Sequence, residues 1–380
     1  MWLLVHGHVC VEAQTTDLRT KELPRWTVEE DLRIGDINDP EQILVRPAVV
    51  RVDDQGHILI MDPGVPTIWE YSSEGRYVGT VGREGDGPGE YRAPAAMGFL
   101  GDTLWVSDAT SGRLTLYASD RSVIESIRFN GGGEPRIPVA LDAHGDVIAV
   151  SPAHAPYEER GTDGIIDFRQ HFLRTDRHGV VVDSLDSQIV QTNIIAVDGA
   201  NRLIRSPFVV RDEPSVGYHE ETGLLYELHR PTPDPEDAVA RFRIVERDGD
   251  GAVLRERTFE DSPRRMDGAV RAELEAEIAE NLDHVEPEFR EAVEDYLASI
   301  GLVPPASGLG RSGGLFWVQR EPFQGTDEYL VLDGNLEPKA VLELPAEADA
   351  VIGPRTKDYV WARVLGDYEV PYVVRYRIER

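Results

Sequence analysis

The chain has 380 residues, of which 41% are hydrophobic, and its 69 acidic and 39 basic side chains give a formal net charge of −30. This composition can form a packed interior and is too apolar for a disordered chain. The negative charge argues against binding to nucleic-acid backbones or anionic membranes, because both need clustered lysine and arginine.

The first residues resemble part of an export signal. Residues 1–14 contain a short apolar patch and a Val11-x-Ala13 step like a signal-peptidase site, but no basic start. We interpret them as the tail of a signal peptide that begins upstream; lipid attachment at Cys10, the single cysteine, is a weaker alternative because Gly7-His8-Val9 matches a lipoprotein motif poorly. No other apolar run approaches about 18 residues, so we predict no membrane span. We expect export to the periplasm or the medium, with the cytoplasm left open.

A six-residue motif repeats along the chain. Gly-Glu-Tyr-Arg-Ala-Pro at 89–94 returns as Gly-Glu-Pro-Arg-Ile-Pro at 133–138, and a looser copy at 40–47 precedes both. Each copy is followed by an apolar segment, a turn and a second apolar segment. Self-similarity at this spacing indicates an array of structural repeats.

Each repeat starts with a predicted β-hairpin whose turn is rich in aspartate and glycine. The first hairpin covers residues 48–62 and turns at 53–56. Five further hairpins of this kind are predicted at 95–108, 139–151, 215–228, 312–319 and 353–363.

A second hairpin follows the first in each repeat, at 68–81, 114–129, 171–185, 242–259 and 329–344. Four antiparallel strands per repeat, at a step in the forties, are typical of a β-propeller blade. The sixth repeat ends after its third strand, at 373–378. We predict that residues 31–35 supply its fourth strand and close the ring, rather than forming an isolated arm, because an open ring would leave exposed edges.

One segment departs from the β pattern. Val270, Leu274, Ile278 and Leu282 recur at helical spacing, and a second helical pattern follows Pro287. We predict two amphipathic helices at about 265–301, inserted between the fourth and fifth blades. The fold expected is therefore an all-β, six-bladed propeller that forms one domain over 31–380, preceded by an N-terminal segment at 1–30.

The linker Gly-Arg-Glu-Gly-Asp-Gly-Pro-Gly-Glu-Tyr-Arg-Ala-Pro at 82–94 resembles the linker between blades in bacterial six-bladed β-propeller proteins related to the NHL repeat. The resemblance runs from about Leu32 to the end of the chain. It implies the fold but little about activity, because that group includes binding and scaffold modules as well as lactonases and lyases.

Arginines stand just before the predicted inner strands, at Arg46, Arg92, Arg136 and, more loosely, Arg211. Guanidinium groups at equivalent positions would form a positive collar at the channel mouth, suited to a carboxylate or phosphate. Alternatively, each arginine forms a local brace with the preceding glutamate or with a neighbouring blade.

The sequence does not identify a catalytic set. Propeller lactonases and lyases, which this chain resembles only in fold, place carboxylates, asparagine or histidine around a divalent metal, whereas arginine and proline occupy the corresponding positions here. Such positions do not suit a hard cation, which needs oxygen ligands. We therefore expect no metal and no cofactor, and we predict a monomeric module that binds a small anionic ligand or a protein. A lactonase-like or lyase-like enzyme is the alternative.

Overall fold

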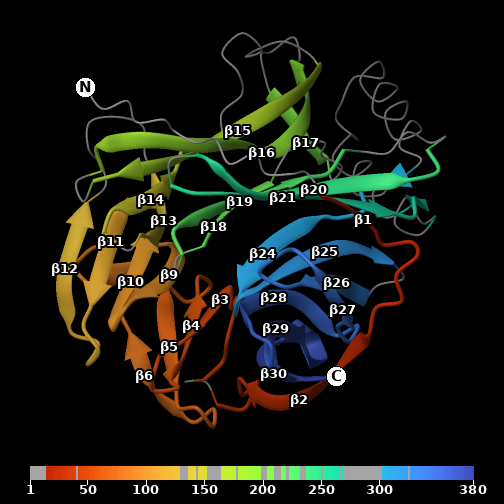
Figure 1. Ribbon diagram of the computed structural model, residues 1–380. Helices are drawn as coiled ribbons and strands as arrows, with labels where there is room; N and C mark the ends of the chain where they lie inside the picture. The colour runs from red at the N-terminus through yellow and green to blue at the C-terminus, as the bar shows by residue number, and fades with distance from the viewer. Residues whose placement is uncertain are drawn as a thin grey trace, which may run out of the picture.

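The computed structural model describes residues 14–39, 42–128, 136–142, 144–151, 164–176, 179–197, 203–208, 215–219, 222–231, 237–249, 251–265, 302–323 and 326–380, together with 268 and 272. Within these ranges the chain forms mainly antiparallel sheets that stand around a common centre (Figure 1). The strands nearest that centre are β3, β9, β13, β18, β24 and β28.

The first two sheets have four strands each, hydrogen-bonded in chain order. The first contains β3 (Val49–Val52), β4 (Ile58–Asp62), β5 (Thr67–Tyr71) and β6 (Tyr77–Val81). The second contains β9 (Pro94–Leu100), β10 (Thr103–Asp108), β11 (Arg113–Tyr117) and β12 (Val123–Arg128). The linker between them forms the short parallel pair β7 (Arg83–Glu84) and β8 (Glu90–Tyr91).

The third and fourth sheets have five strands each. The third contains β13 (Ile137–Leu141), β14 (Val147–Val150), β15 (Gly164–Thr175), β16 (Val181–Val197) and β17 (Leu203–Phe208). The fourth contains β18 (Ser215–His219), β19 (Leu224–His229), β20 (Ala240–Arg247), β21 (Val253–Asp261) and, parallel to β21, the N-terminal β1 (Gln14–Asp17).

The remaining strands of the ring form one eight-stranded sheet. In spatial order it contains β24 (Gly308–Ser312), β25 (Leu315–Phe323), β26 (Thr326–Leu332), β27 (Pro338–Glu343), β2 (Arg25–Ile34), β30 (Pro371–Glu379), β29 (Tyr359–Leu365) and β28 (Ala348–Arg355). A 3₁₀ turn, η2 (Asp367–Glu369), connects β29 to β30.

The predicted closing strand is confirmed, and it does more than complete one sheet. β2 pairs antiparallel with β30 from Thr27 to Ile34, and its first residues, Arg25 and Trp26, pair in parallel with β27. The strand therefore joins two four-stranded halves. It begins at Arg25, before the expected start at residue 31, and β1 lies earlier still, at Gln14–Asp17.

Apart from Arg265, Gly268 and Ala272, the stretch at 265–301 for which two helices are predicted lies outside the described residues, and no α-helix is among the described elements. Arg265, at the start of that stretch, belongs instead to β22 (Arg264–Arg265). β22 pairs antiparallel with β23 (Leu302–Val303), so a short ladder joins the two ends of the insertion. Among the described residues, no helix is long and apolar enough to cross a membrane.

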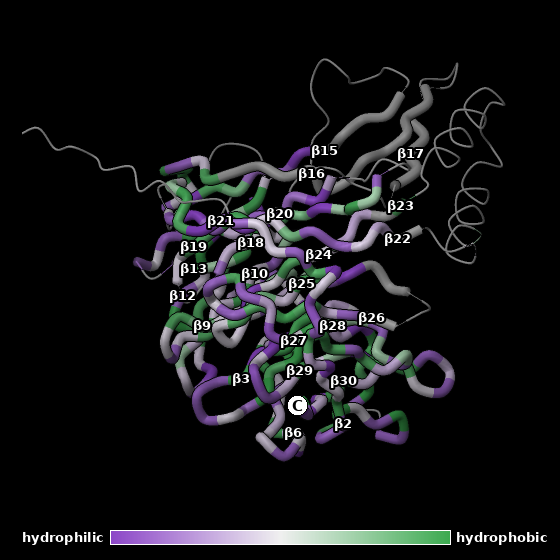
Figure 2. Tube along the Cα trace, turned by 45° about the vertical axis from the view of Figure 1, so that its right-hand side comes forward, coloured by the Kyte–Doolittle hydropathy of each residue, from purple (hydrophilic) through white to green (hydrophobic). Residues whose placement is uncertain are grey.

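The core lies between neighbouring sheets. All five residues of β4, β5 and β11 are buried, because a middle strand is covered on both faces, whereas β12 is mostly exposed. Hydrophobic stretches run along the strands and hydrophilic stretches mark many peripheral loops (Figure 2). Small residues let the inner strands converge: a Cβ atom on Gly353 of β28 would lie 2.6 Å from the Trp361 Cβ and 2.9 Å from the Val50 Cβ of the first sheet.

Candidate functional site

The loop before the first inner strand is held by a buried carboxylate at the end of β4. Asp62 is fully buried, and its Oδ2 accepts a hydrogen bond from the Val45 backbone N at 2.7 Å. Its Oδ1 accepts from the Arg46 and Gly64 backbone N atoms at 2.8 and 2.9 Å. The Asp62 side chain thus fixes the backbone of Arg46 in the loop that precedes β3.

The second sheet repeats this arrangement with Asp108 at the end of β10. Asp108 Oδ2 accepts from the Arg92 and Ala93 backbone N atoms at 2.6 and 2.8 Å, and Oδ1 accepts from Ser111 N at 2.7 Å. Burial opposes ionisation of Asp108, but these hydrogen bonds outweigh it and hold its pKa below the usual range. Asp108 therefore gives Arg92 a backbone environment equivalent to that of Arg46, as the repeated motif predicts.

The side chain of Arg92 forms a local ion pair. Its Nε and Nη2 donate to the two carboxylate oxygens of Asp86 at 3.0 and 2.7 Å. This pair lowers the pKa of the Asp86 carboxyl. Glu90, the brace partner expected from the motif, instead accepts from Arg83 at 2.9 and 2.7 Å.

The other candidate arginines differ from Arg92. The half-buried Arg136 donates through Nη1 to the Gly179 carbonyl oxygen at 2.8 Å, and Arg211 lies outside the described residues. Arg46 is exposed, and among the described residues its guanidinium has no hydrogen-bond or ion-pair partner. Among the described residues, the guanidinium groups of Arg92 and Arg136 therefore have partners, whereas that of Arg46 has none.

Sequence reasoning missed a charged cluster between the first two sheets. Asp53 and His57 of the β3–β4 turn and Glu70 of β5 each place a potential metal-ligand atom within 4.8 Å of the others. Arg121, from the β11–β12 turn, donates to Asp53 Oδ2 at 2.6 Å and to Glu70 Oε1 at 2.7 and 2.9 Å. The guanidinium thus supplies the positive charge that a metal ion would otherwise bring.

The charges in this cluster stabilise one another. Burial opposes ionisation of Asp53, but hydrogen bonds from Arg121 and from the backbone and ring of His57 hold its pKa below the usual range. Arg121 is 51 residues from Glu70, so the turn sequences alone could not reveal the contact. We interpret the cluster as a brace between sheets.

Another buried carboxylate, that of Glu227 in β19, contacts a histidine in the fourth sheet. Glu227 Oε2 lies 2.7 Å from His229 Nε2, and Glu227 Oε1 accepts from Arg247 Nε. Burial opposes ionisation of Glu227, but His229 and Arg247 lower its pKa to about 2. An ionised carboxylate accepts a hydrogen bond from Nε2–H, and in the neutral imidazole with this hydrogen bond the lone pair is on Nδ1.

No protein-family model matches the chain, and no curated protein is similar to it in sequence. Solved structures do match it over nearly its whole length. A predicted exported protein from Bacteroides fragilis superposes with a TM-score of 0.52 at 12% identity, and the match covers 96% of this chain and 98% of that one. The chain has a β-propeller fold.

Two further structures match with lower scores. A member of the duf4221 family from Bacteroides vulgatus has a TM-score of 0.48 at 10% identity, covering 94% of this chain and all of that one. Virginiamycin B lyase from Staphylococcus aureus has a TM-score of 0.43 at 9% identity, covering 93% and 99%. Likeness at this level of identity concerns the fold alone, so the propeller's function must be argued from its own residues.

Proposed function

We propose that this chain is an exported, six-bladed β-propeller that acts as a ligand-binding module. The blade count takes the eight-stranded sheet as two blades joined by β2, next to the two four-stranded and two five-stranded sheets. The proposed relation to the NHL repeat rests on the linker motif at 82–94, and the proposed export rests on the signal-like residues 1–14.

The proposed ligand is a small anion at the channel mouth, and Arg46 is the observation that carries this proposal. Its backbone is fixed by Asp62, its side chain is exposed, and its guanidinium has no partner among the described residues. A planar guanidinium with free donors suits a carboxylate or phosphate. Arg211 is a second proposed contact, whereas Arg92 and Arg136 would first have to leave their present partners.

Titration calorimetry with a panel of small carboxylates and phosphates tests the anion site. Arg46→Ala should weaken binding by roughly 1.5 to 3 kcal/mol, the scale of a hydrogen bond to a charged group. Arg92→Ala is the matched control, because Arg92 occupies the equivalent backbone position but is paired with Asp86; it should leave affinity unchanged. No heat with any anion, or equal losses in both variants, would reject Arg46 as the anchor.

A lactonase-like or lyase-like activity is the second candidate, favoured by the His229–Glu227 pair. In that case His229 acts as a general base, and Glu227 fixes its orientation. Hydrolysis or elimination should then be detectable with a panel of lactones and should be lost in His229→Gln but retained in Arg92→Ala. Activity that survives His229→Gln would exclude this role for the histidine.

A further inference from the structure

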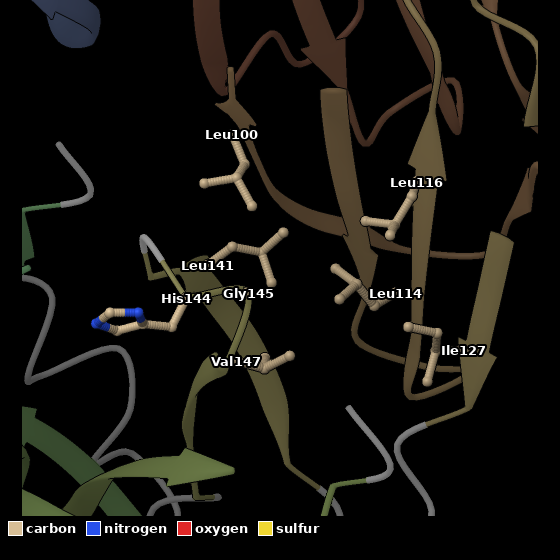
Figure 3. Close-up of a pocket in the computed structure, with 8 residues that line it drawn as sticks. All are labelled: Leu100, Leu114, Leu116, Ile127, Leu141, His144, Gly145 and Val147. Atoms are coloured by element: carbon tan, nitrogen blue, oxygen red, sulfur yellow. The ribbon is translucent and has the colours of Figure 1, made fainter. Parts of the chain in front are cut away.

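An apolar cavity of about 240 Å³ lies where the second and third sheets meet (Figure 3). Its walls carry six aliphatic side chains: Leu100, Leu114, Leu116, Ile127, Leu141 and Val147. His144 and Gly145 of the β13–β14 turn complete the lining. Figure 3 shows the imidazole of His144 pointing away from the leucines, so aliphatic side chains form the walls between the two sheets and polar atoms of the turn lie at the edge.

Each wall contains a pair of residues that lie opposite each other on neighbouring strands of one sheet. Leu114 of β11 lies opposite Ile127 of β12, and Leu141 of β13 lies opposite Val147 of β14. Leu116 is two residues from Leu114 and therefore shares its face of the strand. All five residues are at most 9% exposed, so these walls belong to the core between the two sheets, whereas the half-buried Leu100 and Gly145 and the exposed His144 form the side that opens to solvent.

A space of this kind favours one class of occupant. Water in a cavity needs two to four polar partners, and a lining of leucine, isoleucine and valine does not provide them. An empty apolar cavity instead costs stability in proportion to its volume. A cavity of about 150 Å³ lined by similar residues stays dry and binds benzene, so 240 Å³ accommodates about ten non-hydrogen atoms.

We propose that this cavity is a second ligand site, separate from Arg46, that takes a small uncharged apolar molecule such as an aromatic ring or a short alkyl chain. Charged ligands are disfavoured because the aliphatic walls would leave the charge unsolvated. His144 is exposed at the edge of the lining, so a polar end group of the ligand would lie on the side that faces solvent. The site differs from the proposed anion site in both ligand chemistry and position.

Calorimetric titration of the full chain with toluene tests the proposal, and benzoate serves as the charged analogue. Trp105 is fully buried and packs in the same cluster as the wall residues, so its fluorescence gives a second readout. We expect saturable binding of toluene at one site, accompanied by a change in tryptophan emission. Benzoate should bind at least tenfold more weakly at this site.

Two variants that fill the cavity, Val147→Phe and Leu116→Phe, make the test specific. Each should weaken toluene binding at least tenfold while leaving the far-UV circular dichroism unchanged; if one fails to fold, the other decides. Arg46→Ala is the matched control and should leave toluene binding unaffected. Absence of saturable toluene binding to the folded wild type overturns the proposal, as does binding that survives the filling variants or benzoate binding as tight as toluene.

Discussion

Buried carboxylates at the ends of β4 and β10 are the residues that give the first two sheets the same geometry. Asp62 and Asp108 each accept three hydrogen bonds from backbone N–H groups. One of the three comes from an arginine 16 residues earlier in the chain, Arg46 for Asp62 and Arg92 for Asp108. The visible motif around the arginine is therefore only half of the signal. The aspartate that completes it stands at the end of the hairpin.

Removal of this carboxylate should be costly. Asp108→Ala leaves the backbone N–H groups of Arg92, Ala93 and Ser111 without their acceptor, and we expect the free energy of unfolding to fall by about 3 kcal/mol or more. Urea denaturation measures the change. Asp120→Ala is the control because Asp120 binds Ser122 in an exposed turn, so it should change stability little. Similar losses in both variants would contradict the structural role of Asp108.

Glu227 should make stability depend on acid pH. Its pKa in the folded chain, about 2, lies below the ordinary value of 4.5, so its contribution is complete above pH 4.5 and is lost as pH falls towards 2. We expect a contribution of about 2 to 3 kcal/mol near neutral pH. Urea titrations of wild type and Glu227→Gln between pH 7 and pH 3 measure it. The difference between the two should shrink as pH falls, and a constant difference would show that the carboxylate charge is not involved.

At the scale of elements, the hairpins could be predicted because their turn residues act locally. The predicted turn at 53–56 is present: the Asp53 backbone N donates to the His57 carbonyl oxygen, and Gly56 N donates to the Asp53 carbonyl oxygen. Gly56 has a φ of +86°, a conformation that glycine adopts at little cost. Alternating apolar residues and such turns determine each hairpin without distant contacts.

Elements that depend on distant partners were harder to predict. The residues before Asp31 do not look like a strand, yet Glu29 of β2 forms an ion pair with Arg377 of β30. β1 has only four residues and pairs in parallel with β21, a strand far away in the sequence. Its own residues therefore carry no pattern that would predict a strand. The cluster around Arg121 and the cavity were missed for the same reason, because each is assembled from two sheets.

Truncation tests the role of β2. Deletion of residues 1–35 removes β1 and β2, exposes the edge of β30 and uncovers the core contacts of the buried Ile34, so thermal stability should fall sharply. Differential scanning calorimetry measures the midpoint. Deletion of residues 1–13 keeps both strands and is the control. Equal midpoints for the two truncated chains would show that β2 does not stabilise the ring.

At the scale of the whole molecule, arginines join neighbouring sheets within a strongly acidic chain. Four such contacts between sheets are Arg121 to Glu70, Arg174 to the Gly249 carbonyl, Arg311 to Glu246, and Arg363 to the Pro47 carbonyl. Arg311 and Glu246 are both buried, with side chains 9% and 0% exposed. Part of the limited positive charge is therefore used between sheets, in a chain with a net charge of −30.

Salt should stabilise the propeller. Self-repulsion among excess carboxylates destabilises the compact chain, and salt screens it, with the Debye length falling from about 30 Å at 0.01 M to about 8 Å at 0.15 M. Exposed ion pairs weaken as well, but each contributes little. We therefore expect the thermal midpoint to rise by a few degrees between roughly 0.01 M and 0.15 M sodium chloride. A falling midpoint would show that surface ion pairs dominate.

The position of β2 also determines when the molecule can finish folding. The contact between Arg377 and Glu29 spans 348 residues, so the strand near the start of the chain must wait for the strand near its end to be synthesised. Closing so long a loop is slow, because chain entropy is lost before the pairing compensates for it. The earlier sheets consist of local hairpins and can form first. We therefore expect ring closure to be the late step of folding, and the export proposed above would leave the ring open until the last strand has crossed the membrane.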